Sequence, residues 1–370
     1  MLISTPEQDE LRSVVRRLLD THSSEQHVRS FLDQSSGFDV TSWKLMADQI
    51  GVQALAIPEE YGGAGFGFAE LAIVLEESGR ALLCAPLLST CVLATYALLL
   101  AEDSDAAAEH LPGIAAGDTI ATLAATEGGA AASEEDVRAR AELHDGSYRV
   151  TGVKSYVLDG ADADLLIVAA RTDRGVSLFT VDAHAEGVTT EPLSTLDRTR
   201  NLATITLDSA PASLLGTNGH GWTIVTEVLE VGAAALAAEQ VGGAARVLES
   251  TVEYAKMRQQ FGRPIGSFQA IKHQLADMLV ELESARSAAY YATGAVQAGS
   301  DDRSLASSIA KTYCSDAYYH IAAQSIQIHG GIGFTWEHPA HLYFKRARGS
   351  QTLLGSPGLH RNRIADLVGL

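Results

Sequence analysis

Small and apolar residues recur at helical spacing along residues 232–278, which predicts one buried helix face. The pattern breaks once, at residues 261–268, because proline cannot continue a helix and glycine tolerates a sharp reversal. A second helix is predicted to begin near Ser267 and to run past Leu282. Two long helices joined by a tight connection therefore organise the C-terminal part of the chain.

The N-terminal part, roughly residues 1–117, is also predicted to be helical. Thr5 precedes a proline and two acidic residues follow, the pattern of a capped helix rather than of a signal peptide. Ser42 is expected to cap a second helix, and residues 68–80 to form another. The apolar run 81–101 contains proline and hydroxyl residues, so we expect a buried helix pair and no membrane insertion.

The pattern changes to period two between these helical parts. Alternating segments separated by turn residues predict an antiparallel sheet domain over residues 118–220, followed by a helical bundle over residues 221–370. Residues 131–142, rich in alanine and acid, are expected to form an exposed, mobile connection. The chain is therefore predicted to be an α+β protein with three domains. The segments with strand alternation are 148–151, 164–168, 176–181 and 202–207.

Composition narrows the function classes. A chain of 370 residues with 46% hydrophobic content can bury a large core. The net charge of −19 argues against nucleic acid or an anionic membrane surface as a partner. Three cysteines without metal-ligand spacing predict reduced thiols, a cytoplasmic protein and no metal site.

Three separated motifs carry a family resemblance: MRQQFGRPIGSFQAIKHQLADM at residues 257–278, QIHGGIGF at 327–334 and PEEYGGAGFG at 58–67. Together they resemble the acyl-CoA dehydrogenase family. The resemblance implies an FAD-dependent enzyme of lipid metabolism, in fatty acid or steroid degradation, that oxidises an acyl-CoA thioester to the 2-enoyl-CoA. It also implies an electron-transfer flavoprotein or similar acceptor, and a homo- or hetero-oligomer arranged as a dimer of dimers.

The resemblance implies that FAD lies at a contact between chains. Arg258 and Phe261 would reach the pyrophosphate and adenine of a neighbour's FAD, although a surface salt bridge is the alternative for Arg258. His329 is expected to be packed or solvated rather than catalytic. The basic run at residues 345–348 is expected to be a solvated face, with CoA phosphates or an acidic partner as the alternative. The remaining cofactor residues that the motifs imply are Ile265, Phe268, Gln269, Gln327, Gly330 and Gly331.

The sheet domain matches the family less closely. Thr126 stands where the family has a threonine against the flavin, and its hydroxyl is either a flavin contact or a strand-end cap. Tyr156 stands where the family has a tryptophan, and the resemblance implies that an aromatic ring at this position could still shield one face of the flavin. Leu158 and Asp159 replace the family's threonine and asparagine, so one hydroxyl near the flavin is lost.

The catalytic base is the main departure. The chemistry needs a carboxylate opposite the flavin to remove the α-proton. The family places its glutamate at one of two positions, and alignment puts Leu354 and Gly232 there, so neither expected base is present. Glu239, on the apolar face of the long helix, is either a displaced base or a carboxylate paired inside the bundle, and Glu230 and Glu227 are further candidates for the base.

Three hypotheses follow. The chain is a flavin enzyme that uses Glu239 or an unrecognised base as a homotetramer, or a cofactor-sharing subunit of a two-chain dehydrogenase whose partner supplies the glutamate. The latter resembles the smaller subunits of heteromeric acyl-CoA dehydrogenases for steroid or branched thioesters. The third is a flavin-free relative that binds acyl-CoA, or one that runs other acyl chemistry.

Overall fold

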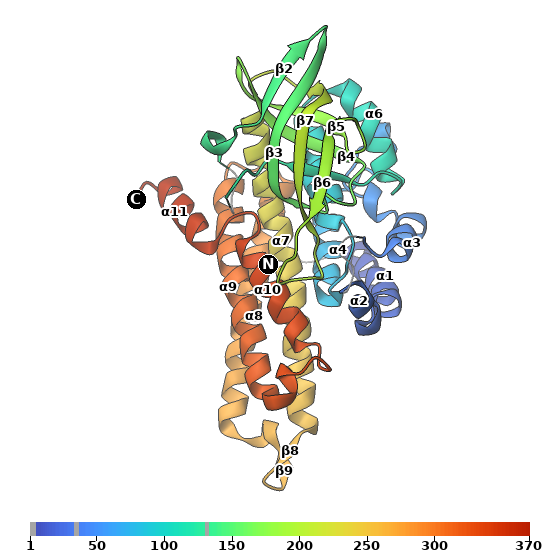
Figure 1. Ribbon diagram of the computed structural model, residues 1–370. Coiled ribbons are helices and arrows are strands. Elements are labelled where there is room, and N and C mark those ends of the chain that lie inside the picture. Colours follow the sequence, from blue (N-terminus) through green and yellow to red (C-terminus); the bar gives the residue numbers. More distant parts are fainter. Residues whose placement is uncertain (1–4, 33–36, 130–132) are drawn as a thin grey trace. The chain divides into compact units, whose positions relative to one another are not determined.

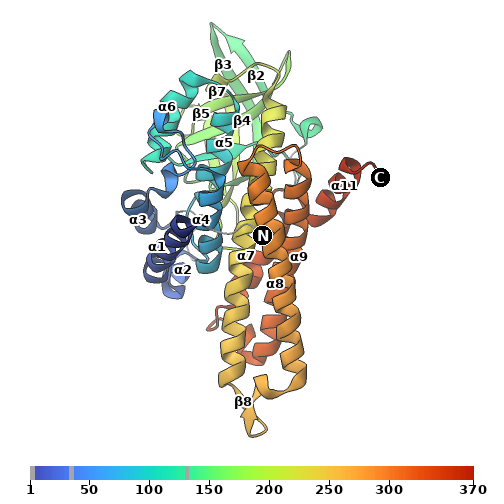
Figure 2. The ribbon, with the colours of Figure 1, turned by 180° about the vertical axis from the view of Figure 1, so that it is seen from behind.

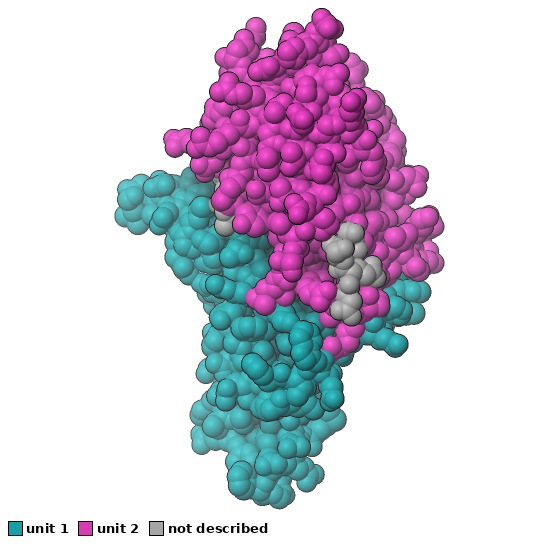
Figure 3. Space-filling model, viewed as in Figure 1, with its two compact units in different colours: residues 1–28, 72–83, 233–370 teal, residues 29–71, 84–232 magenta. Residues whose placement is uncertain are grey.

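The computed structural model describes residues 5–32, 37–129 and 133–370. The chain divides into two compact units (Figure 3). Unit 1 contains residues 1–28, 72–83 and 233–370, and unit 2 contains residues 29–71 and 84–232. The mixed helix and sheet content confirms the α+β prediction.

Unit 2 is built on a sheet whose described strands follow the order β1-β4-β2-β3-β7-β5, with β6 paired to β7 and β5 also paired to β4. Most neighbours are antiparallel, as predicted, but β1 and β2 each pair with β4 in parallel. Alternate side chains such as Val168, Phe179 and Ile205 form its core. The strands are β1 (Ala121–Ala124), β2 (Arg140–His144), β3 (Ser147–Leu158), β4 (Leu165–Thr172), β5 (Gly175–Asp182), β6 (Val188–Pro192) and β7 (Leu202–Leu215).

The expectation of an exposed connection over residues 131–142 is wrong at alternate positions from residue 137 onward, whereas residues 134–136 are exposed. Val137 and Ala139 are buried in unit 2, and β2 begins at Arg140. Small apolar side chains at alternate positions suffice for a strand to pack, even when acidic residues lie between them. The part of the segment at residues 131–132 lies outside the described residues.

The helical elements of unit 2 differ from the prediction in two places. Asp39, not Ser42, caps α3 (Val40–Ile50): its carboxylate accepts from the Ser42 N–H at 2.9 Å. The apolar run 81–101 contains one helical segment after α4, with a π-helical first part (Leu87–Ala94) continuing into α5 (Thr95–Leu100), instead of a helix pair. The other elements are α2 (Glu25–Phe31), which begins in unit 1, α6 (Ser104–Ala115), η1 (Val52–Ala54), η2 (Glu59–Tyr61) and η4 (Glu134–Asp136).

Unit 1 is helical. Its longest elements are α7 (Gly221–Met257, in this unit from residue 233), α8 (Gln269–Gln297) and α9 (Arg303–His329), and Figures 1 and 2 show α8 and α9 side by side. The predicted capping of the N-terminal helix is confirmed, because the Thr5 hydroxyl accepts from the Gln8 N–H at 3.3 Å. The remaining elements are α1 (Pro6–His22), α4 (Phe68–Ala81, in this unit from residue 72), α10 (Ala340–Thr352), α11 (Pro357–Leu367), β8 (Gln259–Gln260), β9 (Arg263–Pro264), η5 (Ile265–Ser267) and η6 (Gly330–Phe334).

Within the described chain, α7 is the one helix long and apolar enough to cross a membrane by length and composition. Its most apolar window is 67% buried inside the protein. A core helix of a folded protein passes the same test, so this helix is weak support for a membrane span.

Helices α4 and α7 cross at two glycines. A Cβ on Gly242 would lie 1.7 Å from the carbonyl oxygen of Glu76, and a Cβ on Gly79 would lie 1.9 Å from the carbonyl oxygen of Glu239. Because both neighbours are backbone atoms, only glycine permits this approach. The two helix axes are therefore held close at this point.

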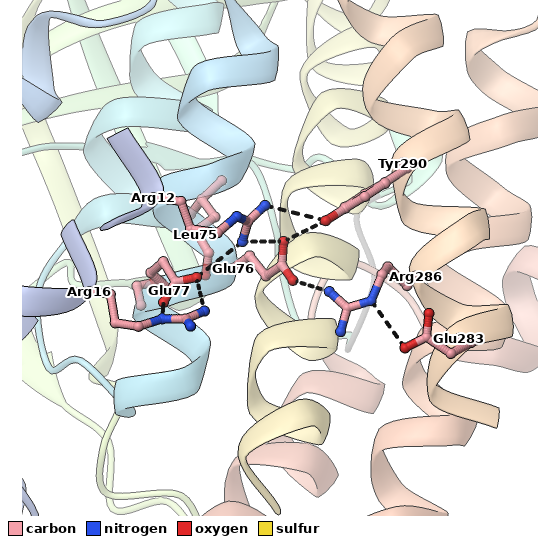
Figure 4. A network of polar contacts seen from close by, with 9 residues as sticks. Arg12, Arg16, Leu75, Glu76, Glu77, Glu283, Arg286 and Tyr290 are labelled. Atoms are coloured by element: carbon pink, nitrogen blue, oxygen red, sulfur yellow. Dashed lines mark hydrogen bonds and ion pairs between the residues drawn. The ribbon is translucent and has the colours of Figure 1, made fainter. Parts of the chain in front are cut away.

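Two adjacent buried carboxylates on α4 tie three helices together (Figure 4). Arg12 on α1 donates to Glu76 at 2.8 Å and to Glu77 at 3.0 Å. Arg16 donates to Glu77 twice, at 2.8 and 2.7 Å, and Arg286 on α8 donates to Glu76 at 2.5 Å. Buried carboxylates need such partners, so the network fixes α1 and α8 against α4.

Candidate functional site

The RQQFG motif forms a hairpin between the end of α7 and the start of α8. Its strands pair Gln260 with Arg263, which leaves Phe261 and Gly262 as the two turn residues. Both have positive φ, 53° and 79°, the combination that two-residue hairpin turns require. The Phe261 side chain is 91% exposed at the tip, although this backbone conformation disfavours a non-glycine residue by about 1 kcal/mol.

The base of the hairpin orders the next predicted cofactor residues. The Ile265 N–H donates to the Arg258 carbonyl at 2.8 Å, and the Phe268 N–H donates to the Ile265 carbonyl at 3.1 Å. The Arg263 guanidinium lies 4.1 Å from the centre of the Phe268 ring, and Phe261 meets that ring edge-to-face at 6.1 Å. Gln269 follows as the first residue of α8 and is exposed.

The QIHGG motif ends α9 at the same end of the bundle as the hairpin (Figure 1). Tyr254, four positions before Arg258, donates its hydroxyl to the His329 carbonyl at 3.2 Å, and the two rings are 4.3 Å apart. The structure therefore brings the two predicted flavin motifs together within unit 1. Gln327, on the last turn of α9, is exposed.

Gly330 and Gly331 form an open surface beside this contact. Gly330 has a φ of 65°, and a Cβ on either glycine would meet no described atom within 4 Å. Exposed glycine backbone can accept an extended anionic group such as a dinucleotide pyrophosphate, and Arg258, in the motif at the same end of the bundle, is also exposed. The residues at this end of the bundle fit the cofactor that the sequence implied.

His329 is packed, in agreement with its interpretation from sequence. It is 4% exposed, its Nδ1–H donates to the Ser325 carbonyl at 2.7 Å, and its ring lies 4.4 Å from that of His338. Burial lowers the pKa of His329, and the bond to Ser325 opposes that shift. The imidazole therefore supports the QIHGG backbone.

In unit 2 the structure places Thr126 beside the segment that carries Tyr156. The Ser155 N–H donates to the Thr126 carbonyl at 2.9 Å. The ladder between β3 and β7 shifts register between Lys154 and Val157, and Tyr156 has a φ of 55° there. This bulge leaves Tyr156 50% exposed while Thr126 is half-buried.

Neither family base position carries a carboxylate. Gly232 is a buried residue within α7. Leu354 has a φ of 58°, and its carbonyl accepts from His360 Nε2 at 3.0 Å. Ser356 then caps α11 by accepting from the Leu359 N–H at 3.3 Å. The backbone of the 354–356 turn is well anchored, but its side chains cannot accept the substrate proton.

Glu239 is buried and paired. It is 5% exposed, and Arg346 Nη1 donates to its carboxylate at 2.9 Å. Arg346 is itself 3% exposed, so the expectation of a solvated basic face is wrong for this residue. The carboxylate of Glu239 is therefore held in a buried ion pair, which agrees with the alternative of a carboxylate paired inside the bundle.

A cavity of about 270 Å³ lies within unit 1, and no residue of the hairpin lines it. Its lining includes three arginines and three carboxylates, together with His338, so the charges of the arginines and carboxylates balance. No group of His, Cys, Asp and Glu suited to a metal ion occurs among the described residues. The charged lining residues of the cavity are Arg16, Arg80, Arg246, Asp20, Glu25 and Glu77.

Family profiles cover nearly the whole chain. The acyl-CoA dehydrogenase N-terminal domain matches residues 5–118, the middle domain residues 122–209 and the C-terminal domain residues 219–369. The chain therefore belongs to the acyl-CoA dehydrogenase family, as the motifs predicted. At the level of the family it is an oxidoreductase that dehydrogenates acyl-CoA, with FAD as the implied cofactor.

Individual relatives match over nearly their full length. Acyl-CoA dehydrogenase IpdE2 of Mycolicibacterium smegmatis is 37% identical over 358 residues, covering 97% of this chain and 97% of that protein. Among solved structures, a variant of the Tcur3481-Tcur3483 steroid ACAD has a TM-score of 0.88 and 33% identity, covering 98% of each chain. The ChsE4-ChsE5 complex from Mycobacterium tuberculosis has a TM-score of 0.90 and 28% identity, covering 99% of this chain and 98% of that chain.

Proposed function

We propose that this chain is a cofactor-sharing subunit of a two-chain acyl-CoA dehydrogenase, and that the partner chain supplies the catalytic glutamate. One observation carries the proposal. The two family base positions hold Gly232 and Leu354, while the nearby carboxylate of Glu239 is held by Arg346. The family resemblance of this chain to the ChsE4-ChsE5 complex supports a heteromeric assembly.

The reaction makes a carboxylate indispensable. The base takes the α-proton of the thioester while the β-hydrogen leaves as hydride, and bound FAD supplies the hydride acceptor. The chain's own residues would bind and orient the cofactor, and the partner's carboxylate would complete the site. Glu239 as a displaced base stays the alternative, and its pairing with Arg346 disfavours it.

The proposed cofactor site combines the two motifs at the end of the bundle. Arg258 would hold the pyrophosphate, the exposed Phe261 would pack on the adenine side, and the open backbone at Gly330 and Gly331 would admit the phosphates. Ile265, Phe268, Gln269 and Gln327 would complete this surface. In unit 2, Thr126 and Tyr156 would face the flavin ring.

A side chain as exposed as Phe261 suits a contact with another chain. We therefore propose an oligomer, arranged as a dimer of dimers, with FAD at the contact between chains. We also propose three domains, with boundaries at residues 1–117, 118–220 and 221–370. The protein is proposed to be cytoplasmic and to pass its electrons to an electron-transfer flavoprotein or a similar acceptor. Similarity to a steroid ACAD supports a bulky, steroid-derived or branched acyl-CoA as substrate.

The test is a dehydrogenase assay with a ferrocenium acceptor over a panel of acyl-CoA thioesters. The chain is assayed alone and after co-expression with a second acyl-CoA dehydrogenase-like chain that carries glutamate at either family position. We expect negligible turnover alone, turnover and a yellow flavin colour in the complex, and loss of turnover when the partner's glutamate becomes glutamine.

Glu239→Gln in the same complex is the matched control. Because Gln preserves the shape of the side chain, activity per folded molecule should be retained while stability falls. Full turnover by the chain alone, abolished by Glu239→Gln, would instead establish Glu239 as the base. A colourless protein that binds acyl-CoA in every combination would favour the flavin-free alternative.

A further inference from the structure

A buried lysine, Lys154, joins two separate segments of unit 2. The proposed reaction gives this lysine no role. Lys154 is 0% exposed, and its ammonium forms an ion pair with Glu127, whose side chain is 10% exposed. Lysine is almost never fully buried without a partner, because the loss of hydration is costly. Burial lowers the pKa of Lys154, and Glu127 opposes that shift.

The bulge in β3 begins directly after this lysine. Lys154 is buried, Ser155 is half-buried and Tyr156 is exposed, with the register shift and the positive φ of Tyr156 directly after Lys154. An unbroken strand would place residues 154 and 156 on the same face. The bulge therefore allows a buried cation and an exposed aromatic ring two positions apart.

Glu127 ties the other segment to the same point. One carboxylate oxygen receives the Lys154 ammonium and the Ala139 N–H at 3.1 Å, and the other accepts from the Arg138 N–H at 2.8 Å. Directly before Glu127, the Thr126 carbonyl accepts from the Ser155 N–H at 2.9 Å. The pair thus fixes the backbone next to Thr126, which directly precedes Glu127, and next to Tyr156, which follows Lys154 by two positions.

We propose that Glu127 and Lys154 are positioning residues for the flavin, which set the Thr126 hydroxyl and the Tyr156 ring and keep that end of β3 electrically neutral. This inference rests on the proposed function, because Thr126 and Tyr156 are proposed flavin contacts. Neither charge touches the reacting atoms in this role. Their effect passes through the backbone they hold and through their charge.

Removal of either charge should shift the flavin midpoint potential, and the two shifts should have opposite signs. Lys154→Met leaves an unpaired carboxylate and should lower the flavin midpoint potential, because negative charge disfavours the anionic reduced flavin. Glu127→Gln leaves an unpaired ammonium and should raise the potential. Local disorder alone would weaken FAD binding in both variants without reversing the sign of the shift.

The experiment uses the full chain in its FAD-loaded assembly, with Lys154→Met, Glu127→Gln and the double variant. FAD affinity is measured by fluorescence titration of the stripped protein, and the midpoint potential by equilibration with redox dyes. Each single variant should weaken FAD binding about tenfold or more, with shifts of opposite sign in potential, because each leaves a buried charge unpaired. The double variant should return the potential toward that of the unmodified protein.

Arg149→Met is the matched control, because it removes a cation from the far end of the same strand. Arg149 donates to the Ser209 carbonyl at 3.1 Å and does not contact Glu127 or Lys154 in the structure. It should change FAD affinity by less than about twofold. Hydrogen exchange of the cofactor-free protein should show faster exchange at Ala139 and Ser155 in Glu127→Gln and Lys154→Met, but not in the control.

The results distinguish failure of the proposed flavin site from failure of the positioning role. If the unmodified assembly binds no FAD, the proposed flavin site fails and this role falls with it. If the assembly binds FAD and both single variants match it in affinity and potential, the positioning role alone is refuted. Shifts of the same sign in both variants would also refute it, since they indicate disorder without the predicted effect of charge.

Discussion

Gly242→Ala tests the close crossing of α4 and α7. The added Cβ would lie 1.7 Å from the Glu76 carbonyl oxygen and 3.0 Å from the Arg80 backbone nitrogen. Carbon and carbonyl oxygen normally stay about 3.3 Å apart, so the helices must separate by roughly 1.6 Å. Because backbone atoms cannot rotate away as side-chain atoms can, this strain must be relieved by a movement of a whole helix.

We expect Gly242→Ala to lower the free energy of unfolding by about 3 kcal/mol, the upper end of the usual range for overpacking. Separation would also stretch the contacts that Glu76 makes with Arg12 and Arg286. Thermal unfolding followed by circular dichroism should show a melting temperature lower by about 5 °C or more.

Gly358→Ala provides the matched comparison. Gly358 lies in the first turn of α11, its φ is not positive, and the nearest described atom to an added Cβ is Ser356 Oγ at 3.7 Å. Alanine is the better helix former, so this variant should be unchanged or more stable by up to about 1 kcal/mol. If Gly242→Ala melts at or above the temperature of the unmodified protein, the reasoning from close backbone contact is refuted.

Three further changes test other parts of the structure. Glu239→Gln or Arg346→Met alone should destabilise the chain by about 3–5 kcal/mol in denaturant titrations, and the double variant by less than their sum, whereas additive effects would show that the pair is not coupled. Burial lowers the pKa of His360 to about 4, below its value of about 6.5 in the unfolded chain. The neutral imidazole therefore stabilises the fold fully above pH ~6.5, and this stabilisation is lost as the pH falls toward 4. His360→Gln should therefore flatten the fall in stability across that window by up to about 3 kcal/mol, and an unchanged pH profile would contradict this. Arg258→Ala should weaken FAD binding about tenfold or more and Arg258→Lys by less, as measured by fluorescence titration, because lysine keeps the charge without the bidentate geometry; equal affinity in all three proteins would remove Arg258 from the site.

Local features were predictable because their causes lie within a few residues of sequence. Thr5 caps α1 as expected, and the proline and glycines of residues 261–268 produce the reversal between α7 and α8. The Ser42 cap was wrong by three positions, because Asp39 and Ser42 are both good caps and the sequence does not say which lies before the first helical N–H groups. The flavin residues of the hairpin stay a prediction that the cofactor experiments address.

The sequence by itself determined the family, the order of helical and strand regions and the absence of a carboxylate at Leu354 and Gly232. Only the tertiary structure decided that Glu239 meets Arg346, 107 residues later, and that Glu127 meets Lys154 inside the sheet. Local patterns report which face of a helix or strand is apolar, but the partner of a buried charge is chosen by how distant elements pack. For this reason the sequence left open whether Glu239 is a base or a paired carboxylate. The packing of α10 against α7 decides that it is paired with Arg346.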